Sequence, residues 1–333
     1  MIESLGNTNV GRDIADMPRV VVLGSSGYDL TIRLPRLPRP GETLLAGDLL
    51  TGLGGKGANQ AIAARRSGAE VSFFTAFGDD DFGRRARQNL ESEEIELTHA
   101  KVVAGSANQV ALIFVGETDG QNLIGVAPGA SALLSPEDVE QLPLDVFQKG
   151  RVMLAALEIR PETVEAGLRR AKKAGMITIL NPAPVDLKAI EILKFVDVIT
   201  PNETEMSALA NMEIPELNDA LGAARNLIAK GVGAVVLTRG ARGCVVVDET
   251  RGAWSIDGHR VKAIDTVGAG DAFNGALAAS LSEGLSLLDA ARRANAAGAL
   301  AVLKPGAQGG LPSRLQIDVL LEEEPIKPKR LDC

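Results

Sequence analysis

The chain has 333 residues, enough for one large domain or two ordinary ones, and carries a formal net charge of −8 at pH 7. Hydrophobic residues make up 45% of it and charged residues 23%, which is typical of a globular protein with a sizeable core. The acidic balance, without a dense basic stripe, argues against a nucleic-acid partner, and no apolar run approaches the roughly 18 residues that a membrane span needs.

The start of the chain is polar and rich in glycine, asparagine and aspartate, and we expect residues 1–18 to form a flexible leader. This stretch lacks the basic segment and the apolar stretch of a secretory signal. The two cysteines, Cys244 and Cys333, provide neither a disulfide framework nor a metal cluster, and they suit a reducing compartment. These features predict a cytoplasmic protein.

From residue 19 onward, short apolar strands alternate with amphipathic helices. RVVVLG at 19–24 is a β-branched run that ends in glycine, typical of a buried parallel strand. Further strands are predicted at residues 70–78, 151–157, 176–181, 196–200 and 234–240. Helices are predicted at residues 57–68, 82–92, 161–175, 217–231, 271–284 and 285–304. The alternation predicts an α/β fold with a doubly wound, mainly parallel sheet that is covered on both faces.

Two stretches, 31–53 and 101–126, interrupt this alternation. Both are strand-like, with turn signals such as RPG and TDG, and neither contains a convincing helix. Because structureless loops of this length are uncommon, we expect a small β-sheet lid over the ligand edge of the main sheet, with ordinary long loops as the alternative. The core then comprises residues 19–30, 54–100 and 127–320, and the charged, proline-containing tail at 321–333 is expected to be flexible.

DTVGAGDAF at 265–273 places Asp265 and Asp271 on either side of a glycine-rich turn before a predicted helix. The glycines let backbone N–H groups point outward and the helix N-terminus attracts anions, so the turn suits a phosphate group. A carboxylate beside phosphate makes sense if Asp271 takes a proton from the group that attacks the phosphate. The alternative is that Asp271 caps the helix, because aspartate is a favoured capping residue.

A second glycine cluster, GLGGKG at 52–57, matches the dinucleotide-binding pattern G-x-G-x-x-G. That pattern needs a strand that runs straight into its first glycine, and the preceding AGDLLT is too broken to be the first core strand, which residues 20–23 already supply. A dinucleotide site also leaves DTVGAGD unexplained, so we disfavour it. GGKGAN instead offers a close-approach loop with one cation, Lys56, and one amide, Asn59, which suits a polyhydroxylated ligand. Asp29, just after the first strand, stands where doubly wound sheets bind ligands, with a turn residue as the alternative.

These motifs carry a family resemblance. GLGGKGANQAIAARRSGAEVSFFTAFGDDDFG resembles the first signature of the ribokinase-like (PfkB) carbohydrate kinases, and DTVGAGDAFNGALA resembles the second. NPAP at 181–184 and TPNETE at 200–205 are also similar to the family, and the likeness covers roughly residues 19–320. It implies a three-layer ribokinase-like fold with a β-sheet lid, and a kinase that transfers the γ-phosphoryl of ATP to a primary hydroxyl of a sugar.

The resemblance also implies roles for individual residues. Asp271 is implied as the general base, beside an anion hole formed by the backbone N–H groups of Gly268, Ala269 and Gly270. The implied sugar contacts are Gly27, Asp29, Gly55, Lys56, Asn59, Glu158 and Asp271. The implied ATP contacts are Asn202, Thr238, Arg239, Gly240, Gly243, Gly270 and Asn295.

Two ions follow from the same resemblance. Glu205 completes an N-x-x-E pattern that the family associates with Mg²⁺ and phosphate, whereas the pattern alone would make Asn202 and Glu205 a helix-capping pair. A monovalent cation, usually potassium, is implied beside the anion hole, because hard cations prefer oxygen donors. Its implied ligands are the Asp265 carboxylate and main-chain oxygens of Val267, Ala301, Lys304 and Gly306.

Two positions depart from the family pattern. After the first strand the family usually has Asn-x-Asp, whereas this chain has Gly27-Tyr28-Asp29, which removes one amide contact to a sugar hydroxyl and puts ribose as the substrate in question. Gly310 stands where the family often has a serine that helps to hold the cation, so we expect weaker dependence on potassium.

Three functions remain open on the sequence. A D-ribose kinase leads, because GGKGANQA, VALIF and NPAP resemble the ribokinase branch of the family. Gly27 motivates the second, a kinase of another sugar or a nucleoside, such as fructose or 2-keto-3-deoxygluconate. The third is a catalytically silent sugar-binding regulator, which the intact Asp271 and Gly-Ala-Gly turn oppose. We further expect a homodimer through the exposed faces of the lid.

Overall fold

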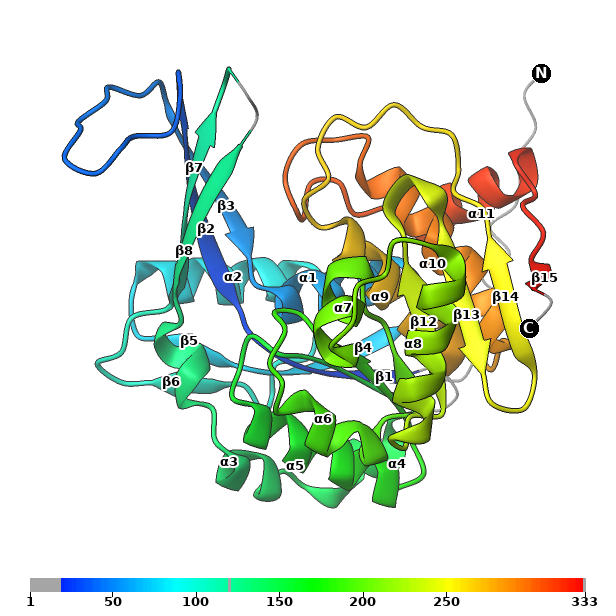
Figure 1. Ribbon diagram of the computed structural model, residues 1–333. Coiled ribbons are helices and arrows are strands. Elements are labelled where there is room, and N and C mark those ends of the chain that lie inside the picture. The colour runs from blue at the N-terminus through cyan, green and yellow to red at the C-terminus, as the bar shows by residue number, and fades with distance from the viewer. Residues whose placement is uncertain (1–18, 119–120, 332–333) are drawn as a thin grey trace, which may run out of the picture.

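The computed structural model describes residues 19–118 and 121–331 (Figure 1). The leader expected for residues 1–18 therefore lies outside the described residues. A nine-stranded sheet has the strand order β15-β14-β13-β12-β11-β10-β9-β1-β4, and a separate four-stranded sheet has the order β3-β2-β7-β8. The α/β fold with a large sheet and a smaller lid sheet is thus confirmed. Among the described residues, none of the helices has the length and apolar character to cross a membrane.

The large sheet is parallel from β4 across to β12 and antiparallel from β12 to β15. Its strands are Arg19–Leu23 (β1), Glu70–Phe74 (β4), Val152–Ala156 (β9), Ile177–Asn181 (β10), Val198–Ile199 (β11), Ala234–Thr238 (β12), Cys244–Asp248 (β13), Gly252–Ile256 (β14) and Lys329–Leu331 (β15). The central strands are continuous apolar runs because helices cover both of their faces.

Helices pack against the two faces of this sheet and create two hydrophobic clusters. They are Lys56–Arg66 (α1), Asp81–Ser92 (α2), Pro136–Glu140 (α3), Leu144–Lys149 (α4), Pro161–Lys173 (α5), Ala189–Ile192 (α6), Glu203–Ala210 (α7), Leu217–Ala229 (α8), Ala269–Ser282 (α9), Leu287–Ala301 (α10) and Arg314–Glu323 (α11). Helix α9 lies between α1 and α10, and every residue from Asp271 to Ser282 is buried. A helix that is apolar nearly all round belongs in a core, so the first turn of α9 is held rigidly.

The lid sheet stands away from the large sheet and is formed by Gly27–Leu34 (β2), Leu49–Gly54 (β3), Gln109–Gly116 (β7) and Asn122–Ala127 (β8) (Figure 1). Its boundaries differ from those expected. The first lid strand begins at Gly27, so Gly27 and Asp29 belong to the lid. Residues Lys101–Val103 (β6) instead pair with Ala76–Gly78 (β5), because the strand predicted at 70–78 is interrupted at Thr75.

Residues 321–331 contain the end of a helix and a strand, so the flexible tail expected for 321–333 is wrong for its described part. Helix α11 ends at Glu323, and β15 then pairs antiparallel with β14. The Arg292 guanidinium also donates to the carbonyl of Ile326 at 2.9 Å. The charged composition of this segment hid its strand, because β15 lies at a sheet edge where charged side chains reach water.

Candidate active site

Asp271 lies in the first turn of α9 and is 6% exposed. Its two carboxylate oxygens accept hydrogen bonds from two amides of α1, Asn59 Nδ2 at 3.0 Å and Gln60 Nε2 at 3.0 Å. The N-cap of α9 is Gly268, with no side-chain capping bond, so the capping alternative for Asp271 is wrong. Both amides come from the glycine-rich segment GGKGANQ, which brings two motifs far apart in the sequence onto one carboxyl group.

The electrostatics of Asp271 combine opposing effects. Burial raises the pKa of its carboxyl, whereas the Lys56 ammonium and the hydrogen bonds from Asn59 and Gln60 lower it, and the net direction is upward. A carboxylate with a raised pKa is a better proton acceptor, and the amides that hold it favour its ionised form.

The turn before α9 leaves backbone donors free. Gly268 has φ 81°, and a Cβ there would lie 2.8 Å from the carbonyl oxygen of Ala307, so only glycine fits. Within the described part of the chain, the N–H groups of Gly268 and Gly270 donate to no other residue, while that of Ala269 donates weakly to the carbonyl of Thr266 at 3.3 Å. Two N–H groups at a helix N-terminus thus stand ready for an anion.

Three further charged groups surround this turn. Glu158, just after β9, accepts from the backbone N–H of Lys56 at 2.8 Å and from the Ser25 hydroxyl. Burial and the neighbouring charges of Glu158 and Asp271 raise the pKa of Asp29 to about 6. Burial lowers the pKa of Lys56, but the carboxylates of Asp271, Glu158 and Glu205 outweigh it and the pKa is raised. The side chains expected to meet the sugar therefore lie together.

Glycines allow this convergence. The Asp29 carboxylate occupies the space where Gly54 would carry a Cβ, at 2.5 Å from both oxygens. Gly55 has φ 87°, and its Cβ would lie 2.7 Å from the backbone nitrogen of Gly27. The glycine run thus packs against the start of β2. A strand does lead into it, because β3 ends at Gly54 and α1 begins at Lys56, but β3 pairs antiparallel with β2 in the lid sheet and is not a strand of the large parallel sheet, as a dinucleotide-binding turn requires.

The residues expected to meet ATP form a more exposed group. Asn202 and Glu205 make a reciprocal capping box at the start of α7, as the pattern alone suggested, and burial raises the pKa of Glu205. The backbones of Thr238 and Asn202 form an isolated parallel β-bridge. Arg239 Nε forms an ion pair with Glu203 Oε1 at 3.3 Å. Gly243 has φ 82°, and its Cβ would lie 2.0 Å from the carbonyl oxygen of Ile256.

Asn295 reaches this group through a neighbouring segment. Its Nδ2 donates to the carbonyl of Asp257 at 2.9 Å, and Asp257 lies directly behind Gly243, whose Cβ would meet it at 2.6 Å. Gly240 itself is open, with nothing within 4 Å of a Cβ. The predicted nucleotide residues are therefore linked into one region.

Most of the residues expected to hold a monovalent cation lie together: Asp265 contacts Val267 and Gly306, and the carbonyl oxygens of Ala301 and Gly306 both lie near Gly310. The Asp265 carboxylate accepts from the backbone N–H of Val267 at 3.0 Å and of Gly306 at 2.9 Å. The donor set of one carboxylate and main-chain oxygens fits a hard cation. However, a Cβ at Gly310 would lie 2.3 Å from the carbonyl oxygen of Ala301, so the loop has no room for the serine that the family often carries there.

No group of three or more histidine, cysteine, aspartate or glutamate residues in the described ranges could hold a metal ion. This fits Mg²⁺ that arrives with nucleotide phosphates and takes one or two protein carboxylates, for which Glu205 is available.

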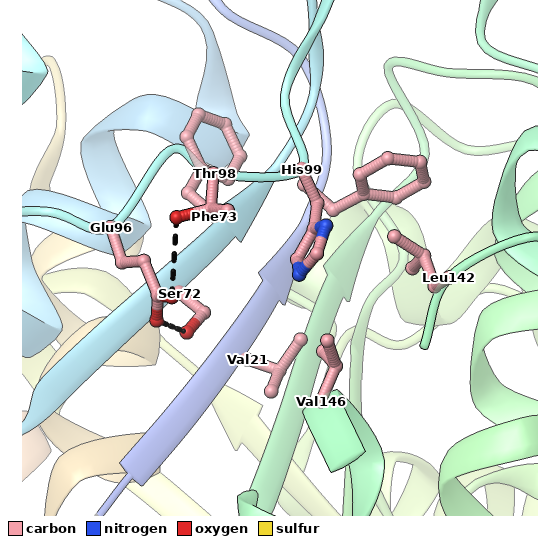
Figure 2. A pocket seen from close by; sticks show the side chains of 9 residues that line it. Val21, Ser72, Phe73, Glu96, Thr98, His99, Leu142 and Val146 are labelled. Atoms are coloured by element: carbon pink, nitrogen blue, oxygen red, sulfur yellow. Dashed lines mark hydrogen bonds between the residues drawn. The ribbon is translucent and has the colours of Figure 1, made fainter. Parts of the chain in front are cut away.

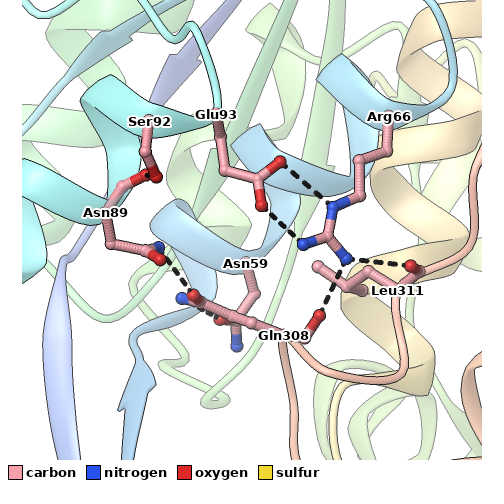
Figure 3. A network of polar contacts seen from close by, with 7 residues as sticks. All are labelled: Asn59, Arg66, Asn89, Ser92, Glu93, Gln308 and Leu311. Atoms are coloured by element: carbon pink, nitrogen blue, oxygen red, sulfur yellow. Dashed lines mark hydrogen bonds and ion pairs between the residues drawn. The ribbon is translucent and has the colours of Figure 1, made fainter.

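A chain of amides behind Asn59 was missed by the sequence analysis (Figure 3). Gln308 Nε2 donates to Asn59 Oδ1 at 3.1 Å, and Gln308 Oε1 accepts from Asn89 Nδ2 at 2.9 Å. Arg66 holds the backbone carbonyl of Gln308 at 2.9 Å and is itself paired with Glu93. Because Gln308 occupies the oxygen of the Asn59 amide, the nitrogen must face Asp271.

A small hollow lies elsewhere, beside the edge strand β4 (Figure 2). It is lined by Val21, Ser72, Phe73, Phe74, Glu96, Thr98, His99, Leu142 and Val146. It contains none of the predicted site residues, and the Glu96 carboxylate in it is already hydrogen-bonded to Ser72. We assign it no function.

Comparisons with known proteins identify the family. The sequence model of the pfkB family carbohydrate kinases matches residues 17–314, and the chain belongs to this family. The ribokinase of Haemophilus influenzae is 38% identical over 303 residues, which cover 91% of this chain and 98% of that protein. The deoxyribokinase of Salmonella typhimurium is 34% identical over 304 residues, which cover 91% and 98%.

Solved structures give the same result. The ribokinase of Thermotoga maritima has a TM-score of 0.82 and 33% identity, over 91% of this chain and 99% of that one. The ribokinase of Arabidopsis thaliana, complexed with ribose and ATP, has a TM-score of 0.83 and 29% identity, over 92% and 99%. The fold is therefore ribokinase-like. The chain is an ATP-dependent sugar kinase, a phosphotransferase that acts on a sugar hydroxyl.

Proposed function

We propose that the chain phosphorylates D-ribose at its primary hydroxyl to give D-ribose 5-phosphate. The observation that carries this proposal is the buried Asp271 carboxylate, held by two amides beside two unpartnered N–H groups at the start of α9. A proton acceptor and an anion site in one helical turn suit the attack of a hydroxyl on a phosphoryl group.

In this mechanism the sugar hydroxyl gives its proton to Asp271 while its oxygen attacks the γ-phosphorus of ATP. The bond from that phosphorus to the oxygen of ADP breaks, and ADP leaves. The free N–H groups of Gly268 and Gly270, with Ala269 beside them, stabilise the negative charge of the transferring phosphoryl group. Asp29, Lys56, Asn59 and Glu158 bind the sugar, with Gly27 and Gly55 as the close backbone around it.

The nucleotide binds against the second group of residues, Asn202, Thr238, Arg239, Gly240, Gly243, Gly270 and Asn295. Glu205 would hold the Mg²⁺ that comes with the nucleotide phosphates, and the ion would supply positive charge at the transferring phosphoryl group. Potassium is proposed at Asp265, with main-chain oxygens of Val267, Ala301, Lys304 and Gly306. Because a Cβ at Gly310 would lie 2.3 Å from the carbonyl oxygen of Ala301, we propose that position 310 contributes no side chain to the cation site.

The test of this function is ADP release with Mg-ATP and potassium for a panel of acceptors: D-ribose, 2-deoxy-D-ribose, fructose, ribulose, 2-keto-3-deoxygluconate and several nucleosides. We expect D-ribose to give the highest kcat/KM. Preference for another compound would assign a different substrate and leave the proposed mechanism unchanged. ATP binding without turnover of any acceptor would favour the silent regulator.

A second candidate substrate, 2-deoxy-D-ribose, is favoured by one observation. Gly27 has no side chain where the family pattern has an amide, and a deoxyribokinase is among the similar proteins. Fewer hydroxyl contacts suit a sugar with one hydroxyl fewer. The same panel separates the two pentoses, because a 2-deoxyribose kinase would show the higher kcat/KM with that sugar.

We also propose a homodimer through the lid. Large apolar side chains are exposed on both faces of the lid sheet: Leu50, Ile124 and Val126 share the face of Asp29, and Leu49, Leu112 and Leu123 lie on the other. Exposed apolar rows of this kind mark interaction surfaces. Light scattering of the purified chain is expected to give the mass of a dimer, and a monomer at all concentrations would exclude this assembly.

A further inference from the structure

The space beside Gly27 is filled by another residue of the lid. Gly27 on β2 is directly opposite Gln109 on β7 in the parallel register. A Cβ at Gly27 would lie 3.2 Å from Gln109 Nε2 and 3.4 Å from its Cγ, which is tighter than ordinary contact. Gln109 therefore occupies the volume that a larger side chain at position 27 would need.

Gln109 also brings an amide to the sugar site. Its side chain is buried, with 4% of the residue exposed, and its Nε2 donates to Glu158 Oε2 at 3.3 Å. Because an ionised carboxylate can only accept, this contact determines which end of the amide faces Glu158. Glu158 is the carboxylate that also holds the backbone of Lys56 and the Ser25 hydroxyl.

The other end of this amide has no partner. Gln109 Oε1 is buried and accepts no hydrogen bond from the described residues. A buried amide oxygen without a donor is unfavourable, so natural proteins rarely retain one without a reason. Sugar hydroxyls are donors, and the surrounding carboxylates of Asp29 and Glu158 show that this region is built from hydroxyl acceptors.

We propose that Gln109 determines sugar specificity: it replaces the amide missing at Gly27, and its Oε1 accepts a hydrogen bond from a ring hydroxyl of the sugar. This inference rests on the proposed sugar kinase function and adds a contact to the same site. Oε1 is buried as well as unpartnered, so the side chain turns about its Glu158 contact when the sugar enters. Because position 27 is a glycine, no side chain there opposes that movement.

The first experiment removes the Gln109 Oε1 acceptor from the protein and, separately, each ring hydroxyl from the sugar. Gln109→Met keeps the length of the side chain but cannot accept strongly. The wild type and this variant are compared with D-ribose and with its 1-, 2- and 3-deoxy analogues, all of which keep the reactive primary hydroxyl. For the analogue that lacks the hydroxyl bound by Gln109, kcat/KM of the wild type should be about 10-fold to 100-fold lower than for D-ribose. In Gln109→Met this difference should disappear, while the differences for the other two analogues should stay.

The second experiment tests whether an amide at position 27 can replace the amide of Gln109. Gln109→Gly should lower kcat/KM for D-ribose about 10-fold or more, mainly through KM, with the KM for ATP within about twofold. Gly27→Asn should also lower it, because the new side chain meets Gln109. The double variant Gly27→Asn/Gln109→Gly should recover at least about 10-fold over either single variant. Gln141→Ala, at an exposed glutamine after α3, is the matched control.

The outcomes separate the two proposals. A wild type that phosphorylates no sugar refutes the proposed function. A wild type that phosphorylates D-ribose, with the same analogue discrimination in Gln109→Met, refutes the role of Gln109 alone. Thermal unfolding of each variant identifies loss of structure, and a folded double variant that is no better than either single variant also overturns the inference.

Discussion

The two halves of the proposed active site are built differently. On the sugar side, Asp271, Asn59 and Gln60 are buried and bonded to one another from two helices. On the nucleotide side, Asn202 and Gly240 are exposed, and the polar groups mostly satisfy their own local structure, as in the Asn202–Glu205 capping box. The proposed sugar side is thus held in place around one buried carboxyl group, whereas the polar groups of the proposed nucleotide side are bonded mainly to their neighbours in sequence.

The strongest test of this contrast is Asp271→Asn. The variant keeps the size of the side chain but removes the proton acceptor, so turnover should fall at least about 100-fold while nucleotide binding is retained. Steady-state kinetics and nucleotide titration measure the two quantities. Near-normal turnover would remove Asp271 from the role of base.

Gln308→Leu tests whether the amide chain behind Asn59 matters. Without the donor from Gln308, the Asn59 amide is free to turn its oxygen toward Asp271, which would be unfavourable for the ionised carboxylate. We expect kcat to fall about 10-fold, in line with the loss of one buried hydrogen bond, with little change in the KM for ATP.

The matched control is Arg87→Ala, which removes an exposed ion pair with Glu91 on α2 and should leave kcat unchanged. An equal loss of kcat in both variants would mean that the change acts through general stability. An unchanged kcat in Gln308→Leu would show that Asn59 is oriented without it.

The pH dependence of sugar binding sharpens the contrast further. The pKa of Asp29 is raised to about 6, so its carboxyl is charged at pH 7 and mostly protonated at pH 5. The charged form accepts hydroxyl hydrogens, so calorimetric affinity for D-ribose without ATP should fall about 10-fold from pH 7 to pH 5. Asp29→Asn should bind more weakly and with less pH dependence, and an unchanged profile would assign the titration to another group.

The smallest effect is expected at the cation loop. Asp265 holds the N–H groups of Val267 and Gly306, so Asp265→Ala should abolish any activation by potassium over sodium, an effect of a few-fold in line with one surface-near ion contact. Initial rates in the two salts at equal ionic strength give the answer. Equal rates in the parent protein would show that the proposed cation site is wrong or redundant.

Local sequence patterns predicted most of the fold and part of the proposed site. The strand at 19–24, the helix after Gly270 and the lid were predictable because period and turn signals are properties of neighbouring residues. Gln308 was not, because it meets Asn59 across 249 positions of sequence. Gln109 was missed for a similar reason: in the sequence it is an ordinary polar residue at the start of a strand, and only the parallel register of β2 with β7 places it against Gly27.

Strand β15 affects whether the edge of the large sheet can pair with a strand of another molecule. It covers β14, whose sequence GAWSI is uncharged and could pair with a strand of another chain. The new outer strand carries Lys329 and Arg330, and the guanidinium of Arg330 lies over the Trp254 ring at 5.8 Å. Charged side chains on an outer strand discourage further pairing, so this short ending protects the sheet against edge-to-edge aggregation. A shortened chain that stops at α11 would expose a bare, uncharged edge.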